Sequence, residues 1–196
     1  MRRFLLLLAM ISCAAPALAQ SSALTIPRNL EQLTSRSAVI VRGTVISARV
    51  EKHPQLTALD TVVVKMQVSE TLKGRPASTF TFRQYVWDIR DSKNAAGYRK
   101  GQDLLLMMIA PSAYGLSSPA GLEQGRFAIS RDSKGREVAV NGRENFKLLD
   151  GIGAQVAAKG IPLSARTASL VQKHLSGPVE VRDLTALIRE LVQAGE

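Results

Sequence analysis

Cysteine is almost absent from this chain of 196 residues, which contains one, Cys13. That residue lies in a segment with the pattern of a secretory signal peptide: two arginines at positions 2 and 3, an apolar stretch over residues 4–11, and Ala-Leu-Ala at 17–19. We expect cleavage before Gln20. A lipoprotein signal cut before Cys13 is the less favoured alternative, because residues 10–12 (MIS) match its pattern poorly. Without Cys13 the mature chain has no disulfide, no thiol chemistry and no cysteine-ligated metal.

Long apolar runs and histidines are also scarce. The apolar part of the signal is shorter than the roughly 20 residues of a membrane span. No later stretch is long enough, so no transmembrane segment is expected in the mature chain. The two histidines, His53 and His174, have no neighbours with the spacing of a zinc site. We therefore expect no cofactor, and the signal predicts a periplasmic or secreted protein.

Acidic residues are outnumbered by basic ones. The chain has 26 Lys and Arg against 16 Asp and Glu, a formal net charge of +10. Removing the two arginines of the signal lowers this charge from +10 to +8. Such an excess favours a polyanionic partner, and for an exported protein an anionic envelope polymer is expected rather than nucleic acid. The alternative is a basic surface that serves solubility alone.

Residues 60–86 show the clearest pattern in the chain. Apolar side chains alternate with polar ones over residues 62–69, and the alternation resumes at Phe80 and Phe82. Between the two runs stand Gly74 and Pro76, which end a strand because glycine accepts positive φ and proline lacks an N–H. The pattern predicts an antiparallel pair of strands, each with one apolar face.

The flanking segments predict more strands. Residues 37–52 are long for one strand and apolar on both faces near their start, which is typical of a bent strand in a small closed barrel, with a bulge at Gly43. The apolar run over residues 104–109 predicts a buried strand. Residues 126–130 and 137–140 predict a hairpin whose turn contains Gly135.

Capping residues and apolar spacing near the two ends of the mature chain predict helices. Residues 29–36 are expected to form a short helix, and a second is expected from a cap at Ser164 to residue 174 or 175. A last helix is expected after a cap at Asp183, because the apolar residues Leu184, Leu187, Ile188 and Leu191 share one face. Residues 150–160, with three glycines, are expected to form a flexible connection.

Four segments carry a resemblance: 37–45 (SAVIVRGTV), 68–74 (VSETLKG), 100–106 (KGQDLLL) and 123–127 (EQGRF). Their order resembles a group of exported bacterial proteins without established activity, similar to the netrin-like, or tissue-inhibitor-of-metalloproteinases-like, OB-fold. The resemblance implies a small antiparallel OB-like barrel with peripheral helices, a mainly β fold. Animal metalloproteinase inhibitors chelate the protease metal through an amino-terminal cysteine. This mature chain has none, so that mechanism is not carried over.

The expected organisation has four parts. Residues 1–19 are the signal, 20–36 a leader with a short helix, 37–149 the OB-like barrel domain, and 150–196 a helical extension packed on the barrel. Basic and aromatic residues gather in the segment from 73 to 100. On a barrel face, such residues bind sugars or bases by charge and stacking. The predicted binding residues are Arg83, Tyr85, Trp87, Arg90, Tyr98, Arg99 and Lys100. The alternative is that the rings complete the core and the charges face solvent.

These observations predict a non-catalytic binding module for a protein partner or an anionic envelope polymer. One alternative is an exported hydrolase with a carboxylate or serine site in the loops 87–101 and 112–124. Its candidate groups are Asp88, Asp91, Ser117, His53 and Glu123. Another alternative is a protease inhibitor that acts by inserting a loop. No catalytic or metal-binding residue is predicted.

Overall fold

The computed structural model describes residues 26–86 and 88–195. The expected signal peptide and Trp87 lie outside this described part. The strands are β1 (Val39–Lys52), β2 (Asp60–Lys73), β3 (Thr79–Tyr85), β4 (Asp103–Met108), β5 (Arg126–Arg131), β6 (Glu137–Asn141) and β7 (Val179–Glu180). The helices are α1 (Leu30–Arg36), α2 (Ile89–Asn94), α3 (Ile152–Ala158), α4 (Ala165–Lys173) and α5 (Val181–Gln193), with short 3-10 turns η1 (Ala95–Gly97) and η2 (Leu122–Gln124).

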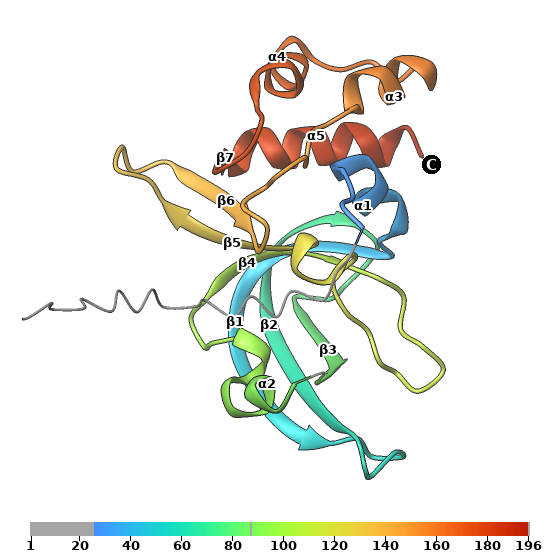
Figure 1. Ribbon diagram of the computed structural model, residues 1–196, viewed down its shortest axis with the longest axis vertical. Coiled ribbons are helices and arrows are strands. Elements are labelled where there is room, and N and C mark those ends of the chain that lie inside the picture. Colours follow the sequence, from blue (N-terminus) through green and yellow to red (C-terminus); the bar gives the residue numbers. More distant parts are fainter. Residues whose placement is uncertain (1–25, 87, 196) are drawn as a thin grey trace, which may run out of the picture.

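All the strands belong to one antiparallel sheet of seven strands in the order β3-β2-β1-β4-β5-β6-β7. The expected antiparallel sheet with helices, including a C-terminal helix, is confirmed, but the described part of the chain is mixed α/β rather than mainly β, because five helices accompany the sheet. The expected closure is wrong: in the described part of the chain, β3 and β7 are the two edges and the sheet is not closed into a barrel. Figure 1 shows β1, β2 and β3 curling together at one end of the molecule, where α2 also lies, while α1, α3, α4 and α5 cover the other end.

Strand β4 lies between two hydrophobic cores. Successive side chains of a strand point to opposite faces of its sheet, and residues 104–108 are all buried, none more than 1% exposed. Leu105 and Met107 join a core with the helices, which we call the helical core. Leu104, Leu106 and Met108 join a second core enclosed by β1, β2 and β3, which we call the curled-sheet core. The two faces of β4 therefore belong to two different cores.

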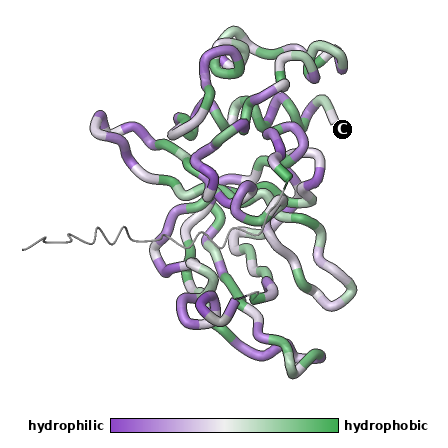
Figure 2. The backbone as a smooth tube through the Cα atoms, in the orientation of Figure 1, coloured by the Kyte–Doolittle hydropathy of each residue, from purple (hydrophilic) through white to green (hydrophobic). Residues whose placement is uncertain are grey.

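The helical core is built on α5. The expected face of Leu184, Leu187, Ile188 and Leu191 is confirmed, and all four side chains are buried. Burial of each such side chain contributes on the order of 2 kcal/mol. The hydropathy of α5 changes repeatedly along its length, as Figure 2 shows. The helix begins at Val181 rather than after a cap at Asp183, because β7 pairs with β6 and leads directly into it.

The other helices close this core. The short helix expected over residues 29–36 is confirmed as α1, whose Asn29 side chain accepts a hydrogen bond from the Gln32 N–H. The helix expected after Ser164 is confirmed as α4. Residues 150–160, expected to be a flexible connection, instead contain α3, because Ile152 and Val156 are spaced about one turn apart and are both buried in the helical core.

The curled half contains the expected hairpin. Strand β2 pairs with β3 in the register that places Val64 opposite Phe82, and both side chains are buried in the curled-sheet core. The register of β1 against β2 shifts between Arg42 and Gly43, as expected for a bulge at the glycine. Every helix in residues 26–86 and 88–195 is too short or too polar to cross a bilayer.

Gly43 is a packing requirement of the curled half. A Cβ atom added there would lie 2.1 Å from the carbonyl oxygen of Gln67 on β2. We expect Gly43→Ala to lower the free energy of unfolding, measured by urea denaturation, by about 3 kcal/mol, because β1 and β2 would have to move apart. Gly153→Ala is the matched control. Its Cβ would lie 3.7 Å from Val171 Cγ1, within a helix, so stability should hold or rise. Equal stability of Gly43→Ala and the unmodified protein would contradict the packing described.

Candidate functional site

The outer edge of β3 is the first feature of the site. In an antiparallel pair, alternate residues direct their backbone groups towards the same neighbour. The Ser78 carbonyl accepts from the Val68 N–H on β2 at 2.9 Å, and the Val86 N–H donates to the Asp60 carbonyl at 3.1 Å. Even-numbered residues of this segment therefore face β2. The backbone groups of residues 79, 81 and 83 point outward, where the sheet has no further strand in the described part of the chain.

Residues 109–118, which we call the flap, cover this edge at one point. The Ser117 N–H donates to the Arg83 carbonyl at 2.8 Å, and Leu116 forms an isolated parallel bridge with Arg83. At its base the flap is closed by two bonds: the Ile109 N–H donates to the Ser118 carbonyl, and the Ser117 hydroxyl donates to the Ile109 carbonyl at 2.7 Å. The flap contains no charged residue.

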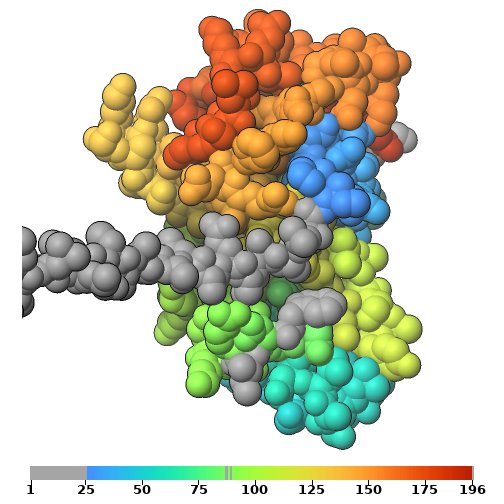
Figure 3. Space-filling view, viewed as in Figure 1, coloured from blue at the N-terminus to red at the C-terminus, as the bar shows by residue number. Residues whose placement is uncertain are grey.

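The flap turns away from β3 at Gly115, which has a φ of +73° and whose N–H donates to the Ser112 carbonyl. A Cβ added at Gly115 would meet no atom within 4 Å. Because of this turn, the flap covers the edge at Arg83 and leaves residues 79–81 uncovered. Figure 3 shows the flap, in yellow-green, beside the tip of the β1–β2 hairpin in teal.

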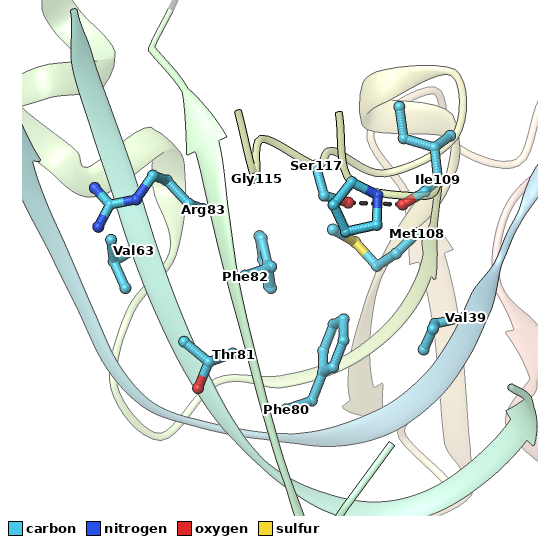
Figure 4. A pocket seen from close by; sticks show the side chains of 11 residues that line it. Val39, Val63, Phe80, Thr81, Phe82, Arg83, Met108, Ile109, Gly115 and Ser117 are labelled. Atoms are coloured by element: carbon cyan, nitrogen blue, oxygen red, sulfur yellow. Dashed lines mark hydrogen bonds between the residues drawn. The ribbon is translucent and has the colours of Figure 1, made fainter. Parts of the chain in front are cut away.

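Between the flap, β3 and the ends of β1 and β4 lies a pocket of about 280 Å³, which we call the seam pocket. Figure 4 shows Phe80, Phe82 and Met108 around it, with the Ser117 hydroxyl bonded to Ile109 at its rim. Most of the lining is apolar, and it includes Val39, Phe80, Phe82, Met108, Ile109 and Ser117. Phe82 and Met108 of this lining also belong to the curled-sheet core.

His53 holds the flap from the hairpin side. The side chain is 1% exposed. Its Nδ1 accepts hydrogen bonds from the backbone N–H groups of Gln55 and Leu56, so the ring proton lies on Nε2, which donates to the Tyr114 carbonyl at 2.9 Å. The rings of His53 and Tyr114 also meet edge to face, with centroids 6.5 Å apart. The histidine therefore fastens the flap to the hairpin.

Arg83 is the predicted binding residue that lies nearest the pocket. Its guanidinium donates to the Glu51 carboxylate at 2.6 Å and to the Thr61 hydroxyl at 2.7 Å, on the outer face of the sheet. In Figure 4 the Arg83 side chain points away from the pocket and towards Val63. Of the six described members of the predicted set, Arg83 is the one that lines the seam pocket.

Arg90 forms an ion pair with Asp88, the residue that caps the N-terminus of α2. The Asp88 carboxylate caps α2 by accepting from the Arg90 N–H at 2.8 Å, and the Arg90 guanidinium bonds the same carboxylate at 2.6 Å. These hydrogen bonds from Arg90 lower the pKa of Asp88 to about 2. A carboxyl with so low a pKa is ionised at neutral pH and does not act as a general acid there.

Tyr98 lies in the interior rather than on a binding surface. Its ring is 2% exposed and packs edge to face against Phe82, with centroids 5.6 Å apart. The Tyr98 hydroxyl lies 3.0 Å from Gln84 Oε1, to which it donates. The Arg126 guanidinium lies 4.8 Å from the ring centroid, a cation–π contact that the sequence did not reveal. Tyr98, which was predicted as a binding residue, is therefore a core residue.

The remaining predicted residues are dispersed. Arg99 and Lys100 are exposed in the turn before β4, and Tyr85 is half-buried at the end of β3. Trp87 lies outside the described residues. The structure thus does not bring the described members of the set onto one stacking surface. The pocket residues Val39, Phe80 and Met108 were missed because sequence patterns showed them only as strand residues.

Four of the groups considered for hydrolysis are engaged in other contacts. Ser117 directs its hydroxyl proton to a backbone carbonyl, whereas a nucleophilic serine donates to a base. Glu123 pairs with Arg126 at 2.8 Å, Asp88 pairs with Arg90, and the His53 ring is bonded to three backbone groups. In residues 26–86 and 88–195, no cluster of three or more His, Cys, Asp or Glu is placed to hold a metal ion.

Comparison with known proteins finds no match: no family model, no curated protein and no solved structure is similar to this chain.

The burial of Tyr98 generates a prediction for alkaline pH. Burial is the largest effect on this hydroxyl; it outweighs the opposing effect of Arg126 and raises the pKa of Tyr98 to about 12. Between pH 10 and 12 the unfolded chain loses this proton and the folded chain keeps it, so the stability contributed by Tyr98 falls as pH rises. We expect a loss of about 1.4 kcal/mol per pH unit in that range. Tyr98→Phe should reduce this slope in denaturation at pH 9, 10 and 11, and an identical slope would contradict the burial effect.

The His53 contact generates a second prediction. His53→Ala removes the hydrogen bond to Tyr114, worth about 1 kcal/mol, and we expect the amide of Ser112 to exchange about fivefold faster with deuterium. Amides of β5 and β6 should be unaffected, because their strands pair at the other end of the sheet. Unchanged exchange at Ser112 would show that His53 does not hold the flap.

Proposed function

We propose that this chain is an exported, non-catalytic binding module whose partner is a protein. The observation that carries the proposal is an apolar pocket beside an uncovered strand edge. Outward backbone groups offer hydrogen bonds to an extended segment, and an adjacent pocket offers a place for one of its side chains. Exposed apolar concavities of this kind mark interaction sites.

The arrangement of charge favours a protein over an anionic polymer. Arg83 is paired with Glu51, Arg90 with Asp88, and the Arg126 guanidinium with Glu123. Tyr98 is buried beneath Arg126 and offers no face for stacking. Charge together with stacking is what a barrel face uses to hold a polymer chain. The basic excess of the chain then serves mainly solubility and encounter.

The proposal also includes export from the cytoplasm and a distant relationship to the netrin-like OB-fold. The signal pattern of residues 1–19 supports export to the periplasm or beyond the cell. The order of motifs in residues 37–127 and the curled arrangement of β1, β2 and β3 support a diverged relative of the netrin-like OB-fold in which closure was lost. On this view residues 37–149 are the binding domain, and residues 150–196 are the extension that covers its second face.

The proposal is tested by affinity capture from an envelope extract with tagged residues 20–196. The column is washed at about 0.1 M and then at about 1 M salt, which shortens the screening length from about 10 Å to about 3 Å. We expect a defined protein to remain bound at high salt, because apolar contacts and backbone hydrogen bonds are little affected by screening. The Arg90→Ala, Arg99→Ala double variant should retain the same protein, since neither side chain lines the seam pocket.

Two other outcomes would overturn the proposal. A polymer that is released at high salt, and that the double variant fails to hold, would make the basic residues the binding surface. If the column retains neither protein nor polymer, the proposed binding function is contradicted, and hydrolase assays are the next step.

A further inference from the structure

The uncovered part of the β3 edge, residues 79–81, specifies how a partner would be held. This inference rests on the proposed function, because it describes the binding mode of a protein partner. Thr79 and Thr81 direct their N–H and C=O groups away from β2, and both side chains are exposed. An edge with free donors and acceptors is a template for one more strand. The flap covers only Arg83, so pairing at the two threonines is left open.

The flap itself shows that an extended segment fits against this edge. Leu116 runs parallel to β3 and bridges Arg83, with the Ser117 N–H bonded to the Arg83 carbonyl at 2.8 Å. The contact ends because the chain turns away at Gly115. A second segment placed along residues 79–81 would continue the same line of pairing and would lie over the mouth of the seam pocket.

The size of the seam pocket fits a side chain better than a whole small molecule. Its volume of about 280 Å³ lies at the lower end of the roughly 300–1,000 Å³ that is typical of sites for drug-sized ligands. The rings of Phe80 and Phe82 form part of its wall, with centroids 5.8 Å apart. An aromatic or large aliphatic side chain of an added strand would complete this wall.

The outer face of the sheet beside this edge, opposite the seam pocket, carries positive charge. Lys65 lies directly across from Thr81 in the β2–β3 register and is exposed, and Arg75 is exposed in the turn before β3. Alternate residues of an added strand would point to the pocket side and to this outer side. A segment with a large apolar residue flanked on each side by an acidic residue therefore matches both faces at once.

We propose that the partner binds as an added β-strand along residues 79–81, with one large apolar side chain in the seam pocket and acidic neighbours on the outer face near Lys65. The pairing supplies affinity through backbone hydrogen bonds, and the pocket and Lys65 supply specificity.

The test uses the mature chain and a synthetic probe, fluorescein-labelled acetyl-Val-Glu-Phe-Glu-Val-amide. Hydrogen exchange followed by NMR should show that the probe protects the Thr81 amide, whereas the Phe82 amide is already bonded to β2 and should not change. Replacing Phe in the probe by Ala should weaken binding at least about tenfold. Replacing both Glu by Lys should weaken it at low salt through repulsion from Lys65.

Two variants of the protein separate backbone pairing from side-chain contact. Thr81→Pro removes the outward N–H without removing a bond to β2, and an edge strand tolerates proline there. We expect about tenfold weaker binding of the probe, the effect of losing a hydrogen bond in a small interface. Thr81→Val keeps the N–H and the branched shape, so it controls for the loss of the threonine side chain, and it should weaken binding less than Thr81→Pro does.

A second measurement needs no variant of the protein. Two further probes are N-methylated at alternate residues, one at the odd positions and one at the even positions. Only the probe whose methyl groups block the N–H groups that face β3 should lose binding. Equal binding of both N-methylated probes, or the same affinity for Thr81→Pro and Thr81→Val, would overturn strand addition. Concentration-dependent dimerisation that protects Thr81 without a probe would assign the edge to a second copy of the chain instead.

Dodecanoate provides the remaining control. Its binding without protection of the Thr81 amide would assign the pocket to an acyl chain and overturn the inference. Failure of the peptide probes, while the envelope protein captured at high salt still binds Thr81→Pro, would reject strand addition and leave the binding module intact. Failure of both would reject the proposed function as well.

Discussion

The architecture depends on the burial of both faces of β4. Leu104, Leu106 and Met108 face the curled-sheet core, while Leu105 and Met107 face the helical core. A strand whose two faces are both apolar must be covered on both sides, because each exposed aliphatic side chain would forfeit on the order of 2 kcal/mol. The curled strands β1, β2 and β3 cover one face, and α5 with α1 and α3 covers the other, as the two ends of Figure 1 show. The two halves share β4, and they also share β1, whose Ile40 lies in the helical core and whose Val41 lies in the curled-sheet core.

The open edge follows from this division. The strands beyond β4 continue along the helical core and do not turn back to meet β3. An exposed strand edge is a hazard because it pairs with other chains, and proteins usually cover it with a loop, a charge or a bulge. Here the flap covers a single residue, Arg83, and is itself fastened by Ser117 and His53. The part of the β3 edge that the flap leaves uncovered lies beside the seam pocket. The candidate site is therefore a consequence of β5 and β6 following the helical core.

Several arginines of the described chain are held in ion pairs. Arg42 on β1 pairs with Glu137 on β6, although β4 and β5 lie between these strands in the sheet. Arg83 and Arg126 pair with Glu51 and Glu123. Each pair is half exposed or less on the arginine side and is worth at most about 1 kcal/mol. Their effect is to place cations beside carboxylates rather than in an open array. Arg126 has a further role, since its guanidinium stacks on the buried Tyr98 ring.

Local patterns were sufficient for most of the secondary structure. Alternation along β2 and β3, the apolar run of β4, and the spacing of Leu184, Leu187, Ile188 and Leu191 in α5 each depend on residues near one another in the chain, so the sequence determined these elements by itself. It did not reveal that the sheet is open, that His53 bonds Tyr114, or that Tyr98 is buried beneath Arg126. The seam pocket joins Val39, Phe80 and Met108 from three strands. Such features arise from contacts between segments distant in sequence, and only the tertiary structure decides which of those segments meet.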